Sequence, residues 1–87
     1  MNIALNRLDR AETGKYIAAH MVYAGVKQDP FTSGAEDEIF KISAGIPRMI
    51  NRICEKTLMY AYQQQKRLID EHIVRFVADH EMVGGIE

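Results

Sequence analysis

Apolar residues recur every three or four positions along most of the chain, which is the spacing of amphipathic helices and not of strands. A first helix is predicted to begin after Asp9, because Glu12 three residues later completes a capping-box pattern. Gly25 predicts its end at about Ala24, since glycine readily adopts the left-handed conformation that terminates helices. The core-facing positions expected on this helix are Tyr16, Ile17, Met21 and Ala24.

A second helix is predicted from a cap at Thr32 or Ser33 to about Ser43. Its acidic run, Glu36 to Glu38, lies in or near the first turn. The macrodipole favours carboxylates there, so a solvated helix start is a better interpretation of this run than a metal site. The buried positions expected on this helix are Ala35, Ile39 and Ile42.

The longest helix is predicted from Ile46 or Pro47 to about Gln65, and Asp70 is predicted to cap a fourth. The third helix has a broad apolar stripe, formed by Met49, Ile50, Ile53, Thr57, Leu58 and Ala61. The fourth is expected to bury Ile69, Ile73, Phe76 and Val77. We therefore expect an all-α fold, a compact four-helix bundle over residues 9–80, with an extended lead-in over residues 1–8 and a flexible tail over residues 81–87.

The junction between the second and third helices carries a charge that helix stability does not favour. Gly45 is a helix stop, and Pro47 suits the first position of the next helix. Arg48 then lies in the first turn, where a cation opposes the macrodipole by roughly 0.3–1 kcal/mol. An anionic ligand would explain it, because a helix start offers N–H groups and a guanidinium binds phosphate oxygens in a bidentate fork. The alternative is a surface arginine that pairs with Asp37 or Glu38, or with Glu55 through Arg52.

Composition and charge narrow the function classes. The 87 residues allow one domain at most, and 47% hydrophobic with 26% charged residues is ordinary for a soluble globular protein. The net charge of −1 provides no global basic field, so any contact with nucleic acid has to be local. The chain has no apolar run of about 18 residues and no signal-peptide pattern, so we expect a cytoplasmic protein without membrane insertion. The single cysteine, Cys54, suits a small buried hydrophobe in a reducing compartment.

The chain lacks the motifs of an autonomous enzyme. It contains no GxxxxGK[ST] or GxGxxG loop for phosphates, no HExxH and no CxxC. His20, His72 and His80 are scattered, whereas the histidines of a metal pair normally lie three or four residues apart. We therefore expect no catalytic residue, no metal site and no catalytic activity of the chain alone.

Several strings together resemble the C-terminal helical lid of AAA+ ATPases. The most specific is Gly45-Ile46-Pro47-Arg48-Met49-Ile50-Asn51, which occurs with Leu8-Asp9-Arg10-Ala11-Glu12-Thr13, Tyr16-Ile17, Ala24-Gly25, Phe31-Thr32 and Ile69-Asp70. The resemblance covers about residues 5–80 and is closest to the ExeA-like general secretion pathway protein A ATPases and the TniB-like transposition ATPases. The chain departs from the pattern at Arg7, where a proline is common, and at His20-Met21, where Arg-Leu is common.

The resemblance implies a lid that closes over ATP and senses it, in a P-loop ATPase acting in secretion-system assembly or DNA transposition. Arg48 matches the sensor 2 arginine, and the other implied nucleotide-binding residues are Gly45, Ile46, Pro47, Tyr16 and Ile17. The implied cofactor is ATP, with Mg²⁺ held by an α/β nucleotide-binding subdomain whose Walker A and B motifs are not in this chain, so that the isolated chain binds no ATP tightly. The implied partners are that subdomain and neighbouring ATPase subunits, with DNA or secretion machinery as a further partner.

Two other function classes remain open. Arg48, Arg52 and Lys56 lie on the third helix and Lys66-Arg67 follow it, so this helix could read duplex DNA as in a helix-turn-helix. Against this reading, much of that helix is committed to the core and the acidic second helix would lie close to the phosphates. The other class is a structural bundle that binds a protein partner, which a large exposed apolar patch would favour.

Overall fold

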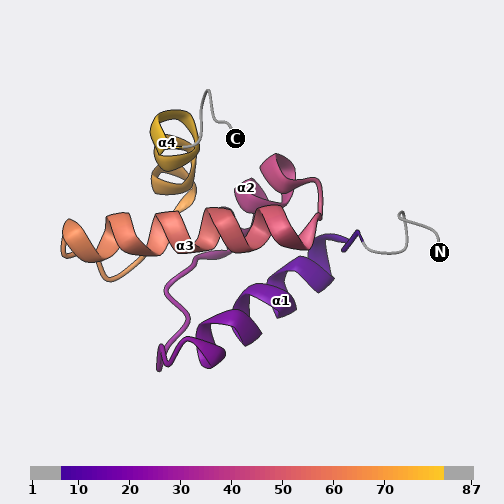
Figure 1. Cartoon of the computed structure of the whole chain (residues 1–87), viewed down its shortest axis with the longest axis horizontal. Coiled ribbons are helices and arrows are strands. Elements are labelled where there is room, and N and C mark those ends of the chain that lie inside the picture. Colours follow the sequence, from indigo (N-terminus) through magenta and orange to yellow (C-terminus); the bar gives the residue numbers. More distant parts are fainter. Residues whose placement is uncertain (1–6, 82–87) are drawn as a thin grey trace.

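The helix boundaries follow local capping chemistry. The computed structural model describes residues 7–81, and its helices are α1 (Arg10–Tyr23), α2 (Ser33–Ser43), α3 (Pro47–Gln63) and α4 (Glu71–Glu81) (Figure 1). The described residues form no strand, so the predicted all-α fold of four helices is confirmed. Most of the predicted lead-in, residues 1–6, and the predicted tail from residue 82 onward lie outside the described part of the chain.

Three of the four helices begin at a side-chain cap that the sequence predicted. The Asp9 carboxylate accepts a hydrogen bond from the Glu12 N–H at 2.7 Å, and the Glu12 carboxylate accepts one from the Asp9 N–H at 2.9 Å. Thr32 and Asp70 cap α2 and α4 in a similar way, with N–H···O distances of 3.1 and 3.0 Å. Each cap satisfies a donor that a helix start leaves unpaired.

The turn between α2 and α3 requires a glycine. α2 ends at Ala44, whose φ of 55° is left-handed, and Gly45 follows with a φ of 77°. The Leu8 N–H donates to the Gly45 carbonyl at 2.8 Å, and a Cβ on Gly45 would lie only 2.1 Å from the Leu8 carbonyl oxygen. The predicted stop at Gly45 therefore also serves as the place where the segment before α1 docks.

α3 ends two residues before the predicted position. Its last residue is Gln63, and Gln65 then adopts a left-handed φ of 58°. The Lys66 N–H donates to the Ala61 carbonyl at 2.8 Å, which closes the last turn as in a Schellman motif. No glycine marks this end, so composition alone could not locate it.

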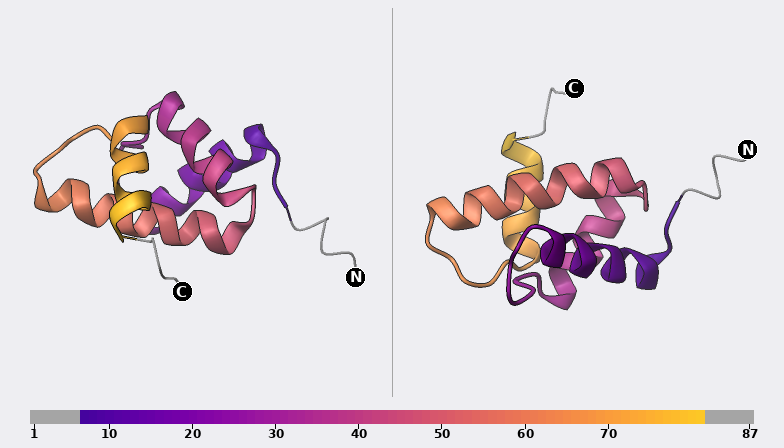
Figure 2. Two further views of the ribbon diagram at one scale, coloured as in Figure 1. Left: turned by 90° about the horizontal axis from the view of Figure 1, so that it is seen from above. Right: turned by 60° about the horizontal axis from the view of Figure 1, so that its bottom comes forward.

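The core forms along α3, which runs between the other helices. α1 and α4 each pack against α2 and α3, and Figure 1 shows α1 and α4 on opposite sides of α3. The turned views in Figure 2 show the connections that follow α1 and α3 passing close to each other. The largest fully buried apolar side chains are Ile17, Met21, Ile39, Ile50, Ile53, Ile69, Val74 and Val77.

Two residues that were predicted to be buried, Ile42 and Phe76, are exposed, and a residue one or two positions away is buried instead. Ile42 is 36% exposed while the neighbouring Ser43 is buried, and Phe76 is 41% exposed while Val74 is fully buried. α2 packs against all three other helices and α4 packs against α2 and α3, so the apolar pattern alone did not settle which stripe turns inward. Ser43 tolerates burial because its hydroxyl accepts a hydrogen bond from the Gly45 N–H at 3.1 Å. Of the other expected core positions, Ala24 is exposed, and Tyr16, Met49, Leu58 and Ile73 are half-buried.

Candidate functional site

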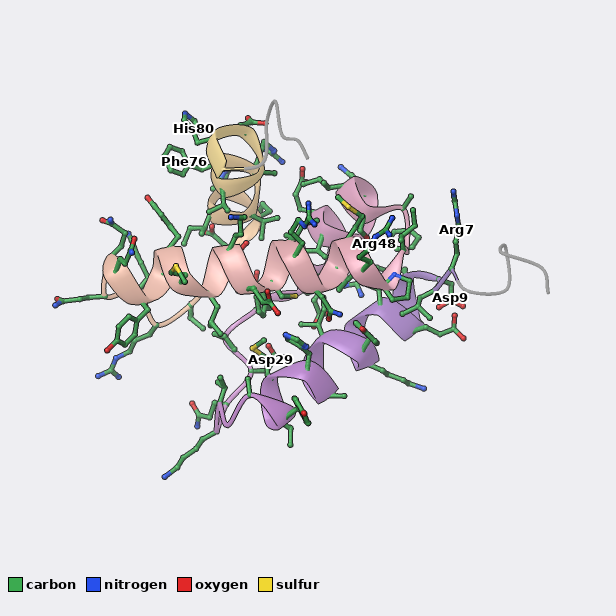
Figure 3. The ribbon with its side chains drawn as sticks, in the orientation of Figure 1. Arg7, Asp9, Asp29, Arg48, Phe76 and His80 are labelled. Atoms are coloured by element: carbon green, nitrogen blue, oxygen red, sulfur yellow. The ribbon has the colours of Figure 1, made fainter. Side chains whose placement is uncertain are left out.

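α3 begins with an uncapped, positive end. Ile46 occupies the cap position without a side-chain hydrogen bond to the helix, Pro47 takes the first position, and the first turn contains no acidic residue. Arg48 comes next, and its side chain is exposed, as expected (Figure 3). The macrodipole and the guanidinium place positive charge at the same point, which favours an anionic ligand.

The carboxylates at the start of α2 are engaged with other cations. Arg10 on α1 reaches two of them: its Nη2 lies 3.2 Å from Glu36 Oε1, and its Nε donates to Asp37. The hydrogen bond with Asp37 raises the pKa of the Arg10 guanidinium, which stays charged throughout the ordinary pH range. Asp37 is therefore already paired, and the same ion pairs join α1 to α2.

Glu38, the other alternative partner of Arg48, is held by α4. The Nη2 and Nε atoms of Arg75 lie 3.2 and 3.3 Å from the two Glu38 oxygens, and Lys41 Nζ lies 3.9 Å away. The hydrogen bond from Arg75 holds the pKa of Glu38 below its ordinary value. Within residues 7–81, Arg48 makes neither an ion pair nor a hydrogen bond through its side chain, so the ion-pair interpretation is not supported.

The other residues implied by the resemblance come from the α2–α3 turn and from α1. Gly45 is buried in the turn just before Arg48, and the hydrogen bond from Leu8 brings the start of α1 onto this turn. Tyr16 is half-buried, roughly 10 Å along α1 from its first residue. Ile17 is fully buried, so of these two residues only Tyr16 is accessible to a ligand. A nucleotide-binding role for this set stays a prediction.

The tertiary structure adds a cation that the sequence did not single out as functional. Arg7 is exposed and immediately precedes Leu8, whose backbone bond to Gly45 holds this segment against the α2–α3 turn. Figure 3 shows Arg7 and Arg48 at the same end of the molecule. The sequence marked Arg7 only as a departure from a common proline, and no local signal predicts the contact that places it.

The described residues contain no grouping of His, Cys, Asp and Glu that could hold a metal ion. Burial raises the pKa of the Cys54 thiol to about 12, so this thiol stays protonated at neutral pH and behaves as the predicted buried hydrophobe. No helix in residues 7–81 is long and apolar enough to cross a membrane.

Comparison with known proteins gives one partial similarity. General secretion pathway protein A of Aeromonas hydrophila is 34% identical over 55 residues, which are 63% of this chain and 10% of that protein. The chain therefore spans about a tenth of the length of the curated relative it matches. No protein-family profile matches the chain, and no solved structure matches it.

Proposed function

We propose that this chain is the helical lid of an AAA+ ATPase and that Arg48 binds the terminal phosphate of ATP when the lid closes. The observation that carries the proposal is an exposed arginine at an uncapped helix start, while the acidic residues of α2 are paired with Arg10 and Arg75. The partial similarity to general secretion pathway protein A supports the same parent class. A lid of this kind has no turnover by itself and needs the nucleotide-binding subdomain.

In the proposed closure, the chain supplies charge and shape and the α/β subdomain supplies the phosphate-binding loop and Mg²⁺. Arg48 offsets negative charge that develops on the γ-phosphoryl oxygens. Gly45, Ile46 and Pro47 form the turn that approaches the adenine and sugar, with Tyr16 on α1 as a further contact. Arg7 adds a second cation at the same end of the chain.

The parent protein is proposed to be a cytoplasmic P-loop ATPase of secretion-system assembly or DNA transposition. The similarity to a general secretion pathway protein favours the first of these two processes. Neighbouring ATPase subunits and the secretion machinery are the partners that such a role requires.

The experiment compares Arg48→Ala in the 87-residue chain and in the full-length protein. The isolated variant should keep its stability within about 0.5 kcal/mol, as expected for an exposed side chain. The full-length variant should bind ATP and close with lower affinity and hydrolyse it more slowly, because the terminal phosphate loses a charged partner. Arg67→Ala, an exposed arginine beyond the other end of α3, is the matched control and should change neither property.

A variant that unfolds the isolated chain while hydrolysis per folded full-length molecule is unchanged would make Arg48 a structural residue. Binding of duplex DNA with a steep salt dependence would favour the DNA-reading alternative. The structure speaks against that alternative, because Ile50, Ile53 and Cys54 turn one face of α3 into the core and Glu55 lies among the exposed residues of the helix.

A further inference from the structure

An apolar groove runs along the C-terminal half of α3. Its volume is about 640 Å³, and its apolar lining comes from Leu58, Met59 and Tyr62 of α3 together with Val26, Pro30 and Ile69 from the connections. The Ile69 N–H donates to the Pro30 carbonyl at 2.8 Å, and the Thr32 N–H donates to the Ile69 carbonyl at 3.0 Å. These backbone bonds hold the two connections together, so the groove has a fixed wall opposite α3.

The side chains on and beside this groove are unusually exposed for their size. Met59 is 63% exposed and Tyr62 is 84% exposed, and both line the groove. Single exposed apolar residues are ordinary, but a group of them around one groove marks an interaction surface. Tyr62 alone can bury roughly 150–250 Å², a substantial part of the about 800 Å² per partner in a stable interface.

Opposite charges stand at the two ends of the groove. Glu55 lines it on the N-terminal side of Leu58, and Lys66 lines it just beyond the end of α3. Glu55 lies roughly 12 Å along α3 from its last residue, Gln63, and Lys66 follows in the turn beyond that end. Within residues 7–81 neither of them forms an ion pair.

We propose that a second copy of this chain fills the groove, with the two α3 helices antiparallel about a two-fold axis. Antiparallel pairing sets Glu55 opposite the partner's Lys66 at both ends, and the same register sets Met59 opposite the partner's Tyr62. A two-fold interface needs a patch that is complementary to itself in this way. Sulfur against an aromatic ring is a favourable contact, and a net charge of −1 per chain opposes association only weakly.

The charge pattern separates this occupant from others. A uniformly acidic or basic peptide would meet a like charge at one end of the groove, whereas an antiparallel copy meets an opposite charge at both ends. The inference goes beyond the lid function, because Tyr62 lies roughly 20 Å along α3 from Arg48 and a phosphate at Arg48 would not cover the groove.

Sedimentation equilibrium of the 87-residue chain, from micromolar to millimolar concentration, tests the proposal. We expect a monomer–dimer equilibrium that weakens at high salt. Glu55→Lys and Lys66→Glu should each raise the dimer Kd about tenfold or more, because each variant places like charges together at both ends. The double variant should return the Kd toward the wild-type value, and Tyr62→Ser should weaken the dimer by removing its apolar centre.

Two exposed sites away from the groove provide matched charge reversals. Asp79→Lys and Lys15→Glu make the same changes in net charge and should leave the Kd unchanged. Circular dichroism of every variant confirms that the helices are retained. As a second readout, a mixture of Met59→Cys and Tyr62→Cys chains should form a disulfide-linked heterodimer, while the buried Cys54 does not compete.

A chain that stays monomeric at millimolar concentration overturns the proposal. A dimer that is indifferent to Tyr62→Ser, or that the double charge reversal fails to restore, also overturns it, because the contact then lies on another face. If the chain dimerises but the mixture of Met59→Cys and Tyr62→Cys chains forms no disulfide, the proposed antiparallel register is wrong.

Discussion

The two halves of α3 are enclosed to different degrees and expose different side chains. In the first half, Ile50, Ile53 and Cys54 are fully buried, and the exposed residue nearest the helix start is Arg48. In the second half, Met59 and Tyr62 are largely exposed beside an open groove. Within residues 7–81, α3 therefore presents at one end a cation that forms no ion pair and at the other end an exposed apolar surface.

Packing within the chain accounts neither for the exposed Arg48 at one end of α3 nor for the exposed Met59 and Tyr62 at the other. The exposed guanidinium of Arg48 at the N-terminal end favours binding of an anion. The groove at the C-terminal end favours binding of an apolar surface. The two ends therefore suit two different partners, a phosphate at Arg48 and a second chain at Met59 and Tyr62.

The largest expected effect tests the difference in enclosure. Ile50→Ala should cost about 2–5 kcal/mol of unfolding free energy, because it removes a fully buried side chain from the enclosed half. Leu58→Ala should cost less, about 1–2 kcal/mol, because Leu58 is half-buried and borders the groove. Urea unfolding of both variants at low concentration gives the comparison. Equal losses would mean that the second half is as enclosed as the first.

The next prediction concerns the turn that positions Arg48. Gly45→Ala should cost about 3 kcal/mol, because it combines a left-handed φ with a Cβ that meets the Leu8 carbonyl oxygen. Gly25→Ala is the control: Gly25 has a φ of 85° but no atom within 4 Å of the added Cβ. That variant should lose only about 1 kcal/mol of unfolding free energy, because an alanine there is strained by the positive φ but meets no neighbouring atom. Thermal melts showing the same loss for both would contradict the docking of Leu8 on this turn.

A smaller effect should separate a paired arginine from an unpaired one. Arg10→Ala should cost about 1 kcal/mol, because it leaves Glu36 and Asp37 without their cation and loosens α1 from α2. Arg48→Ala should change the stability by about 0.5 kcal/mol or less. Chemical unfolding of the two variants measures this difference. A larger loss for Arg48→Ala would reveal a structural partner at the start of α3.

The smallest expected effect is the contribution of Glu38 to stability in acid. Arg75 lowers the pKa of Glu38 in the folded chain, so the stabilisation from Glu38 is complete above the ordinary glutamate pKa of about 4.3. It is lost as the pH falls through the lower, folded value. Glu38→Gln should therefore flatten the acid limb of a plot of melting temperature against pH.

The predicted helix starts were correct because capping depends on neighbours. Asp9 with Glu12, Thr32 and Asp70 each act within three residues along the chain, so their effect can be read from the sequence. The phase of α2 and α4 was less predictable. Whether Ile42 or Ser43 turns inward depends on how α2 lies against the three other helices, and no local pattern contains that information.

The candidate site divides in the same way. The sequence predicted Arg48 in the first turn of a helix, and the position is confirmed because Gly45 and Pro47 act locally. The sequence left open whether Asp37 or Glu38 pairs with Arg48. That question was settled by Arg10 and Arg75, which reach α2 from positions about 27 and 37 residues away along the chain.

The sequence by itself determined the four helices, their caps and the cation at the start of α3, because each follows from interactions within about one helical turn. Only the tertiary structure decided which carboxylates were already paired and that Leu8 lies on Gly45. It also decided that Met59 and Tyr62 border an open groove. These features join segments far apart along the chain, and they depend on how the helices pack and not on the propensity of any one of them.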